Sequence, residues 1–250
     1  IINAYAWKLL IKNIVYNGNK LNIIKIFLAT NIYKYLPGGI WHFVSRFKTL
    51  RLELSTEKSV ESILLEPLLM LVAGLIFVPF GSANISIFIL CWSSTLVFLP
   101  VFREFLINKL KALKANLFTK IDPIKDRKLV KDNQVISIRV FYPYKPLFVE
   151  IIFILFRFMG FLCCINAFSI GSLMSQEELI SSFSLAWIIG LIVPAAPGGV
   201  GVFESVILFS LGSNLPEAPL LASLLCYRLV STISDVFAAL IYPVKKLLKI

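Results

Sequence analysis

The sequence has little from which a catalytic or metal site could be built. It contains one histidine, His42, and its four cysteines lie in apolar segments without paired spacing. Such cysteines are typical of small buried side chains, not of a disulfide framework or a zinc site. The glycine run at 198–201 lacks the lysine and the preceding strand of a nucleotide-binding loop. No nucleophile–base pair is evident. We therefore predict that the protein is not an enzyme and uses no cofactor or metal.

Acidic residues are also scarce, with 14 Asp and Glu against 25 Lys and Arg, and the formal net charge is +11. The basic residues gather mainly in polar stretches between apolar runs. That distribution follows the positive-inside rule, under which basic loops stay cytoplasmic beside anionic lipids. We therefore expect membrane lipids with anionic headgroups as partners, and no nucleic acid.

Apolar residues, by contrast, make up 58% of the chain, and the mean hydropathy is +0.84. Several runs reach the ~18 apolar residues that suggest a spanning helix. They predict spans at about 60–80, 84–102, 147–170 and 217–243. The fold class is therefore an all-α polytopic membrane helix bundle, with one transmembrane domain over residues 1–250. Residues 1–10 read as the tail of a further helix, whose start we expect upstream.

Charged loops predict the orientation of these spans. The segment 103–145 carries eleven Lys or Arg against four acidic residues, and the chain ends in the basic stretch 245–249. Both are predicted to be cytoplasmic. The segment 171–179 contains Glu177 and Glu178 and no basic residue, which suits the outer side.

Two apolar segments are broken by proline and glycine, which disfavour a continuous helix. The first, at about 21–54, contains Pro37-Gly38-Gly39, and the second, at about 180–211, contains Pro197-Gly198-Gly199. By the predicted orientation each begins and ends on one side of the membrane, so each is expected to be a re-entrant hairpin. The two would enter from opposite faces, as in inverted-repeat transporters that bind cargo at broken helices. Close packing of small residues is the alternative reason for such triplets.

A few charges lie inside the apolar segments, where each costs at least about 2.5–3.5 kcal/mol without a partner or a wet cavity. They are Glu66, Glu150, Arg157, Glu204, Arg228 and Asp235. Their spacing places Arg228 and Asp235 on one face of a helix, two turns apart. Glu204 opens a half-helix, where the helix dipole favours a carboxylate. It could pair with Arg228 or Arg157 in a structural network, or it could contact cargo.

The candidate substrate-binding residues combine the two predicted hairpin tips with nearby charges. They are Pro37, Gly38, Gly39, Arg46, Arg157, Pro197, Gly198, Gly199, Gly201, Glu204, Arg228 and Asp235. We expect structural roles for His42 and for the aromatic residues Tyr35, Trp41 and Tyr227.

Three stretches of the sequence resemble one known family. They are Lys34-Tyr35-Leu36-Pro37-Gly38-Gly39-Ile40-Trp41 followed by Arg46, the segment Pro197-Gly198-Gly199-Val200-Gly201-Val202-Phe203-Glu204, and Leu225-Cys226-Tyr227-Arg228-Leu229. They resemble the transmembrane domain of the lysylphosphatidylglycerol synthase/flippase family. The resemblance implies a bacterial cytoplasmic (inner) membrane domain that moves lipid across the bilayer. In the best-known members the cargo is aminoacylated phosphatidylglycerol made by a fused synthase. No such synthase is recognised in these 250 residues, so aminoacyl transfer is not implied.

The working hypothesis is a translocase or transporter of an anionic or aminoacylated phospholipid or a lipid-linked molecule. The alternative is a non-catalytic scaffold subunit that partners a glycosyltransferase or another membrane enzyme. An intramembrane enzyme acting on lipid is a weaker third hypothesis, because no acid–base set is evident.

Overall fold

Every regular element in the described part of the chain is a helix, which confirms the predicted all-α fold. The computed structural model describes residues 1–14, 22–82, 84–99, 142–193 and 199–241. The elements, with η marking 3₁₀ turns, are α1 (Ile2–Ile14), α2 (Ile23–Asn31), η1 (Ile32–Tyr35), α3 (Trp41–Leu50), α4 (Thr56–Leu75), η2 (Val78–Gly81), α5 (Ile85–Ser93), η3 (Ser94–Phe98), α7 (Tyr144–Ala167), η4 (Gly171–Leu173), α8 (Gln176–Ile192), α9 (Val202–Leu211) and α10 (Glu217–Ile241).

Four of these helices begin at a side chain that caps the first turn. Asn22 precedes α2, Ser55 precedes α4, Asn84 precedes α5 and Ser175 precedes α8, and each side-chain oxygen accepts a backbone N–H of the turn that follows. Such a cap stabilises a helix by about 1 kcal/mol. The positions at which these helices start are therefore set locally by the sequence.

Three segments are long and apolar enough to cross a membrane, judged by length and composition. They are Lys58–Gly81, Tyr144–Ala167 and Glu217–Ile241, which correspond to three of the four predicted spans. The segment predicted at 84–102 forms a shorter apolar helix, Ile85–Phe98. Most of the basic loop at 103–145 and all of the tail at 245–249 lie outside the described residues, so their cytoplasmic placement stays a prediction.

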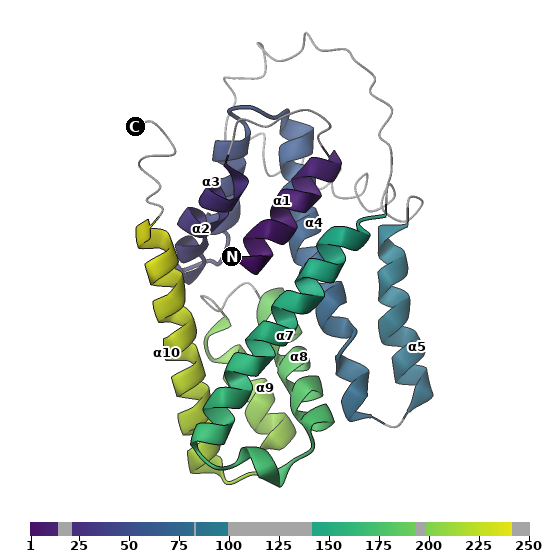
Figure 1. The fold of residues 1–250 in the computed structure, drawn as a ribbon, viewed down its shortest axis with the longest axis vertical. Helices are drawn as coiled ribbons and strands as arrows, with labels where there is room; N and C mark the ends of the chain where they lie inside the picture. The colour runs from purple at the N-terminus through teal and green to yellow at the C-terminus, as the bar shows by residue number, and fades with distance from the viewer. Residues whose placement is uncertain (15–21, 83, 100–141, 194–198, 242–250) are drawn as a thin grey trace.

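Both broken segments fold back on themselves as helical hairpins. In the first hairpin, α2 and η1 are followed by α3, and in the second α8 is followed by α9, with the two arms of each hairpin packed together. Figure 1 shows the hairpins entering the bundle from opposite ends, with α10 running beside both. Their tips face each other near the middle of the long axis. The depth at which each hairpin would lie in a bilayer stays a prediction.

A cluster of buried aromatic rings holds the second hairpin against its neighbours. Phe161 of α7, Phe183 of α8, Phe203 of α9 and Tyr227 of α10 are all at most 5% exposed. Their ring centroids lie 5.3–6.3 Å apart in six pairs, five of them edge-on or tilted. Aromatic pairs in such arrangements contribute about 0.5–1.5 kcal/mol each beyond their burial. The cluster fixes α9 between α8 and α10 and so positions the tip that precedes it.

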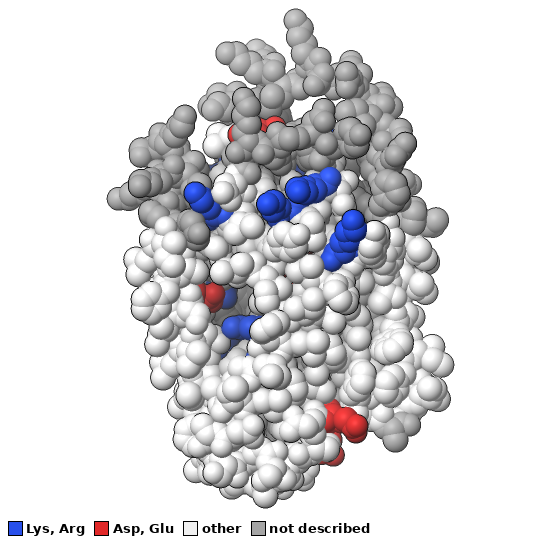
Figure 2. All heavy atoms as spheres, viewed as in Figure 1, with Lys and Arg blue, Asp and Glu red and all other residues white. Residues whose placement is uncertain are grey.

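Charge is distributed unevenly along the molecule. On the face drawn in Figure 2, a band of Lys and Arg lies near one end with a few acidic side chains beyond it, acidic side chains lie at the other end, and the surface between is almost uncharged. α1 ends at the first of these ends with Lys12 in its last turn, and α8 begins at the second with Glu177 and Glu178. The orientation of the molecule in a membrane stays a prediction.

Candidate functional site

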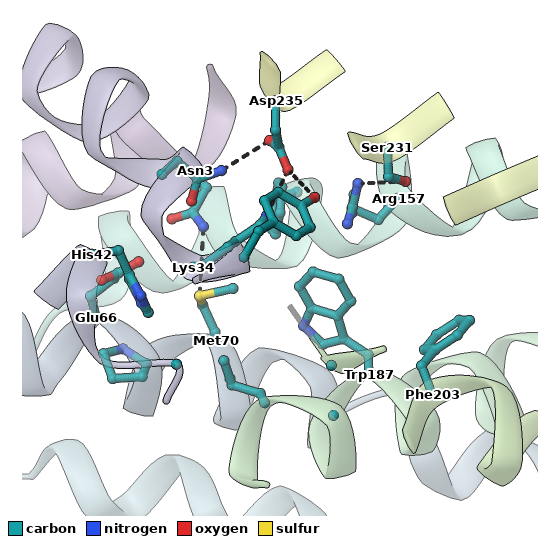
Figure 3. Close-up of a pocket in the computed structure, with 18 of the residues that line it drawn as sticks. Asn3, Lys34, His42, Glu66, Met70, Arg157, Trp187, Phe203, Ser231 and Asp235 are labelled. Carbon is teal, nitrogen blue, oxygen red and sulfur yellow. Dashed lines mark hydrogen bonds and ion pairs between the residues drawn. The ribbon is translucent and has the colours of Figure 1, made fainter. Parts of the chain in front are cut away.

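A charged cavity of about 340 Å³ lies where the two hairpin tips meet. Its lining includes Gly39 of the first tip, Gly199 of the second, and residues of α2, α3, α4, α7, α8 and α10. Figure 2 shows a hollow on the flank of the molecule, within the otherwise uncharged belt, with acidic and basic atoms inside it. Figure 3 shows the cavity from within. Polar groups from distant parts of the chain therefore converge inside an apolar bundle.

Asp235 of α10 is bound by the first hairpin. Its carboxylate accepts from Asn31 Nδ2 at 2.9 Å and from the Tyr35 hydroxyl at 2.8 Å, and it forms an ion pair with Lys34 Nζ at 2.7 Å (Figure 3). The sequence analysis placed Asp235 near Arg228 and did not predict Lys34 as its partner. Tyr35, for which a structural role was expected, helps to hold this carboxylate through its hydroxyl.

Arg228 of α10 is bound by the second hairpin. Its Nε donates to Glu204 Oε1 at 2.5 Å, and its Nη2 donates to the Gly199 carbonyl at 2.7 Å. The other oxygen of Glu204 accepts the Gly201 backbone N–H at 2.8 Å. Of the two partners expected for Glu204, the structure selects Arg228. The carboxylate also lies at the N-terminus of α9, where the sequence analysis expected the helix dipole to favour it.

The glycines of the second tip are required by the backbone. Gly199 and Gly201 have φ values of +71° and +86°, in the left-handed region that disfavours other L residues. A Cβ at Gly199 would also lie 3.2 Å from the Gly190 carbonyl oxygen of α8. The tip therefore approaches α8 as closely as a backbone can, and the Gly199 carbonyl is thereby directed at Arg228.

Arg46 of α3 is enclosed. Its Nη1 forms an ion pair with Glu66 Oε2 of α4 at 2.6 Å, and its Nε donates to Thr30 Oγ1 at 3.2 Å. Its guanidinium lies 3.8 Å from the centroid of the Phe27 ring. The sequence analysis named Glu66 as a charge within a span but assigned it no partner. Arg46 reaches the cavity wall with its charge already balanced.

Arg157 of α7 has a different environment. Its Nη1 donates to Ser231 Oγ at 3.1 Å, and its guanidinium carbon lies 4.9 Å and 5.4 Å from the ring centroids of Trp187 and Tyr227. No carboxylate in the described part of the chain forms an ion pair with it. Arg157 is thus a cation held in the cavity wall by a hydroxyl and two aromatic faces.

The remaining predicted site residues belong to the two tips, and Glu150 is the remaining charge that the sequence analysis named inside the apolar segments. Pro37 and Gly38 form the first tip, where the Pro37 carbonyl accepts from Trp41 Nε1 at 2.8 Å and Gly38 has a φ of +95°. Pro197 and Gly198 lie outside the described residues. Glu150 is buried on α7 and is not among the residues that line the cavity.

Two cavity residues were missed by sequence reasoning. Lys34 lies in the motif Lys34-Tyr35-Leu36-Pro37-Gly38-Gly39, and a lysine next to a predicted tip inside an apolar run was a usable signal. Trp187 sits in the apolar helix α8, where one more aromatic residue gives no signal of its own. Among the described residues, no group of three or more His, Cys, Asp or Glu could hold a metal ion.

Helices of membrane-spanning length, two opposed broken hairpins and a charged cavity between them define a helical membrane protein with an internal polar site. The chain belongs to the family described as the lysylphosphatidylglycerol synthase TM region, whose family model matches residues 1–239. This family is membrane-embedded and is associated with lipid handling or flipping. No curated protein and no solved structure matches the chain.

Proposed function

We propose that the protein is a lipid translocase of the cytoplasmic membrane, which moves an anionic or aminoacylated phospholipid or a lipid-linked molecule between leaflets. The observation that carries this proposal is the charged cavity between two hairpin tips that enter from opposite ends. A polar headgroup crosses a bilayer slowly because charge is costly in hydrocarbon. A polar cavity at mid-height lowers that cost at the point where it is greatest.

The position of the hollow supports a lipid as cargo. It opens on the flank of the molecule, not at an end (Figure 2). Large apolar side chains of α10, including Leu229, Ile233 and Phe237, are exposed on the molecule's surface. A headgroup could therefore enter sideways while its acyl chains stay in the surrounding lipid.

Among the predicted cations, Arg157 is the proposed receiver of an anionic headgroup. Arg46 and Arg228 each form an ion pair with a carboxylate, whereas Arg157 has none in the described part of the chain. The two ion pairs on α10 would hold the two tips in place. The proposed activity includes no bond-making step, cofactor or metal.

The test is a leaflet-exchange assay. Purified protein is reconstituted into liposomes that carry fluorescent phosphatidylglycerol, aminoacylated phosphatidylglycerol or phosphatidylethanolamine, and a membrane-impermeant quencher reports movement between leaflets. Acceleration of any of these lipids over protein-free liposomes is the expected result. If all three move at the protein-free rate, the translocase proposal is wrong and a scaffold subunit for a membrane enzyme is the better explanation.

A further inference from the structure

Three helices carry unpartnered hydrogen-bond donors on residues that line the cavity. Arg157 Nε, Trp187 Nε1 and the Tyr227 hydroxyl are buried and have no hydrogen-bond partner among the described residues. All three residues line the cavity, and they come from α7, α8 and α10. The guanidinium of Arg157 contacts both rings, so the three groups form one cluster. We call Arg157, Trp187 and Tyr227 the donor cluster.

Buried donors are nearly always satisfied in folded proteins, because burial without a partner forfeits their hydrogen bonds to water. Three unpartnered donors in one cavity wall therefore require an explanation. His42 Nδ1 and Asn3 Oδ1 also lack partners and line the cavity. Figure 3 shows His42 and Asn3 on one side, and Arg157 and Trp187 together on the other. A ligand that supplies several acceptor atoms at the donor cluster would satisfy it.

The carboxylates of the cavity are already paired. Asp235 forms an ion pair with Lys34, Glu66 with Arg46, and Glu204 with Arg228. An ammonium group would have to displace one of these cations to find a carboxylate in the described cavity wall. The faces of Trp187 and Tyr227, which could otherwise attract a cation, are taken by Arg157.

The charges of these cavity residues therefore sum to one positive charge. The three ion pairs cancel, and Arg157 remains. A phosphodiester carries one negative charge and two acceptor oxygens that a guanidinium recognises well. The net charge of the cavity and its unpartnered donors thus both favour a phosphodiester as the ligand.

We infer that the donor cluster binds a phosphodiester oxyanion and that the cargo headgroup carries no ammonium group. This inference rests on the proposed function and narrows it to singly anionic lipids such as phosphatidylglycerol. Zwitterionic phosphatidylethanolamine and aminoacylated phosphatidylglycerol are then poor cargo, because their amino group meets no unpaired carboxylate in the described cavity wall.

The first experiment measures binding in detergent and requires no transport. The melting temperature of the purified protein is followed as phosphatidylglycerol, phosphatidylethanolamine, aminoacylated phosphatidylglycerol or inorganic phosphate is added. We expect an increase with phosphatidylglycerol and little change with the other three. An equal increase with either amino lipid would overturn the exclusion of ammonium groups. An increase with inorganic phosphate alone would assign the donor cluster to a free oxyanion and overturn a lipid ligand.

Conservative variants test whether phosphatidylglycerol binds at the donor cluster. Trp187→Phe and Tyr227→Phe each keep an aromatic ring and remove one donor, and Arg157→Gln removes the charge. We expect each Phe variant to weaken phosphatidylglycerol binding about tenfold, since one hydrogen bond to a charged group is lost, and Arg157→Gln to weaken it further. The melting temperature without lipid should not fall in Tyr227→Phe, because the lost hydroxyl had no partner, whereas Trp187→Phe also loses ring contacts with Phe183 and should melt slightly lower. Unchanged lipid affinity in both Phe variants would overturn the donor cluster as the binding site.

Tyr142→Phe is the matched control. It also removes one tyrosine hydroxyl, which in this case donates to the Thr95 carbonyl at 3.1 Å and does not line the cavity. Its melting temperature should fall slightly and its lipid preference should stay unchanged. The leaflet-exchange assay distinguishes failure of this inference from failure of the proposed function. If the wild-type protein moves both amino lipids as fast as phosphatidylglycerol, this inference is wrong and the translocase proposal is unaffected. If the wild-type protein binds phosphatidylglycerol selectively but moves no lipid, the translocase proposal is wrong and the binding site is unaffected.

Discussion

The two hairpins are tied to one helix by ion pairs of opposite polarity. The first hairpin supplies the cation, Lys34, and α10 supplies the carboxylate, Asp235. The second hairpin supplies the carboxylate, Glu204, and α10 supplies the cation, Arg228. The α10 partners are seven residues apart and therefore share a face. One helix face thus positions both tips.

Exposure separates these two ion pairs from the third pair in the cavity wall. At the first hairpin, the side chains of Lys34 and Asp235 are 25% and 20% exposed. At the second, those of Arg228 and Glu204 are 20% and 16% exposed. The side chains of the third pair, Arg46 and Glu66, are only 2% and 6% exposed. A buried pair holds structure, because either charge alone would be stranded. A pair that solvent reaches contributes less to stability. The comparison assigns Arg46 to the scaffold of the first hairpin, whereas the two α10 pairs tie the tips to one helix.

The largest expected effect is at the buried pair. Arg46→Ala should lower the free energy of unfolding by about 3–5 kcal/mol, because it leaves the Glu66 carboxylate buried without its cation. Thermal or denaturant unfolding in detergent measures this loss. The double variant Arg46→Met with Glu66→Met should recover most of it, since no stranded charge remains. If Arg46→Ala were as stable as wild type but failed to bind lipid, Arg46 would be a cargo residue, as the sequence analysis predicted.

The next effect tests whether the two α10 pairs are equivalent. Asp235→Asn should destabilise the protein by about 1–2 kcal/mol, because Lys34 loses its carboxylate in a largely buried site that solvent still reaches. Adding Lys34→Gln should restore most of that loss, since the stranded charge is removed. At the second tip, Arg228→Gln should cost a similar amount, and adding Glu204→Gln should not restore it, because Arg228 also donates to the Gly199 carbonyl.

Double-mutant cycles on unfolding and on leaflet exchange check both halves of that prediction. Rescue at the first tip and none at the second would show that the second tip is held through its backbone as well as its charge. Equal rescue at both tips would show that the Gly199 hydrogen bond contributes nothing, and the two tips would then be electrostatically alike.

The sequence predicted these features to different degrees, for physical reasons. The interruptions at Pro37–Gly39 and around Gly199 are local, since proline and glycine disfavour helix wherever they stand. Both hairpins were therefore predictable. The Glu204–Arg228 pair was one of two predicted options, because so few charges lie within the apolar segments that partners are nearly enforced.

The partners of Asp235 and Arg46 were not predictable in the same way. Asn31 and Tyr35 lie some 200 positions from Asp235 in the chain, and only the meeting of α10 with the first hairpin brings them together. The donor cluster was hidden for a further reason. Trp187 and Tyr227 have the same composition signal whether their polar atoms are satisfied or not, and only the packed structure shows which of them lack a partner.

The last comparison concerns the backbone of the two tips. Gly38 and Gly199 both have positive φ values, of +95° and +71°, so alanine at either should cost about 1–2 kcal/mol from backbone strain alone. Their surroundings differ. A Cβ at Gly38 would meet only Trp41 Nε1, at 3.9 Å, whereas a Cβ at Gly199 would lie 3.2 Å from the Gly190 carbonyl oxygen and 3.6 Å from Arg228 Nη2.

Gly199→Ala should therefore lower the melting temperature more than Gly38→Ala, and it alone should slow leaflet exchange, because the Gly199 carbonyl and Arg228 would be pushed apart. Thermal unfolding of the two variants side by side measures the difference. An equal fall in melting temperature would mean that the second tip accommodates a Cβ as readily as the first. The close approach of Gly199 to α8 would then be a consequence of packing and not the feature that directs its carbonyl at Arg228.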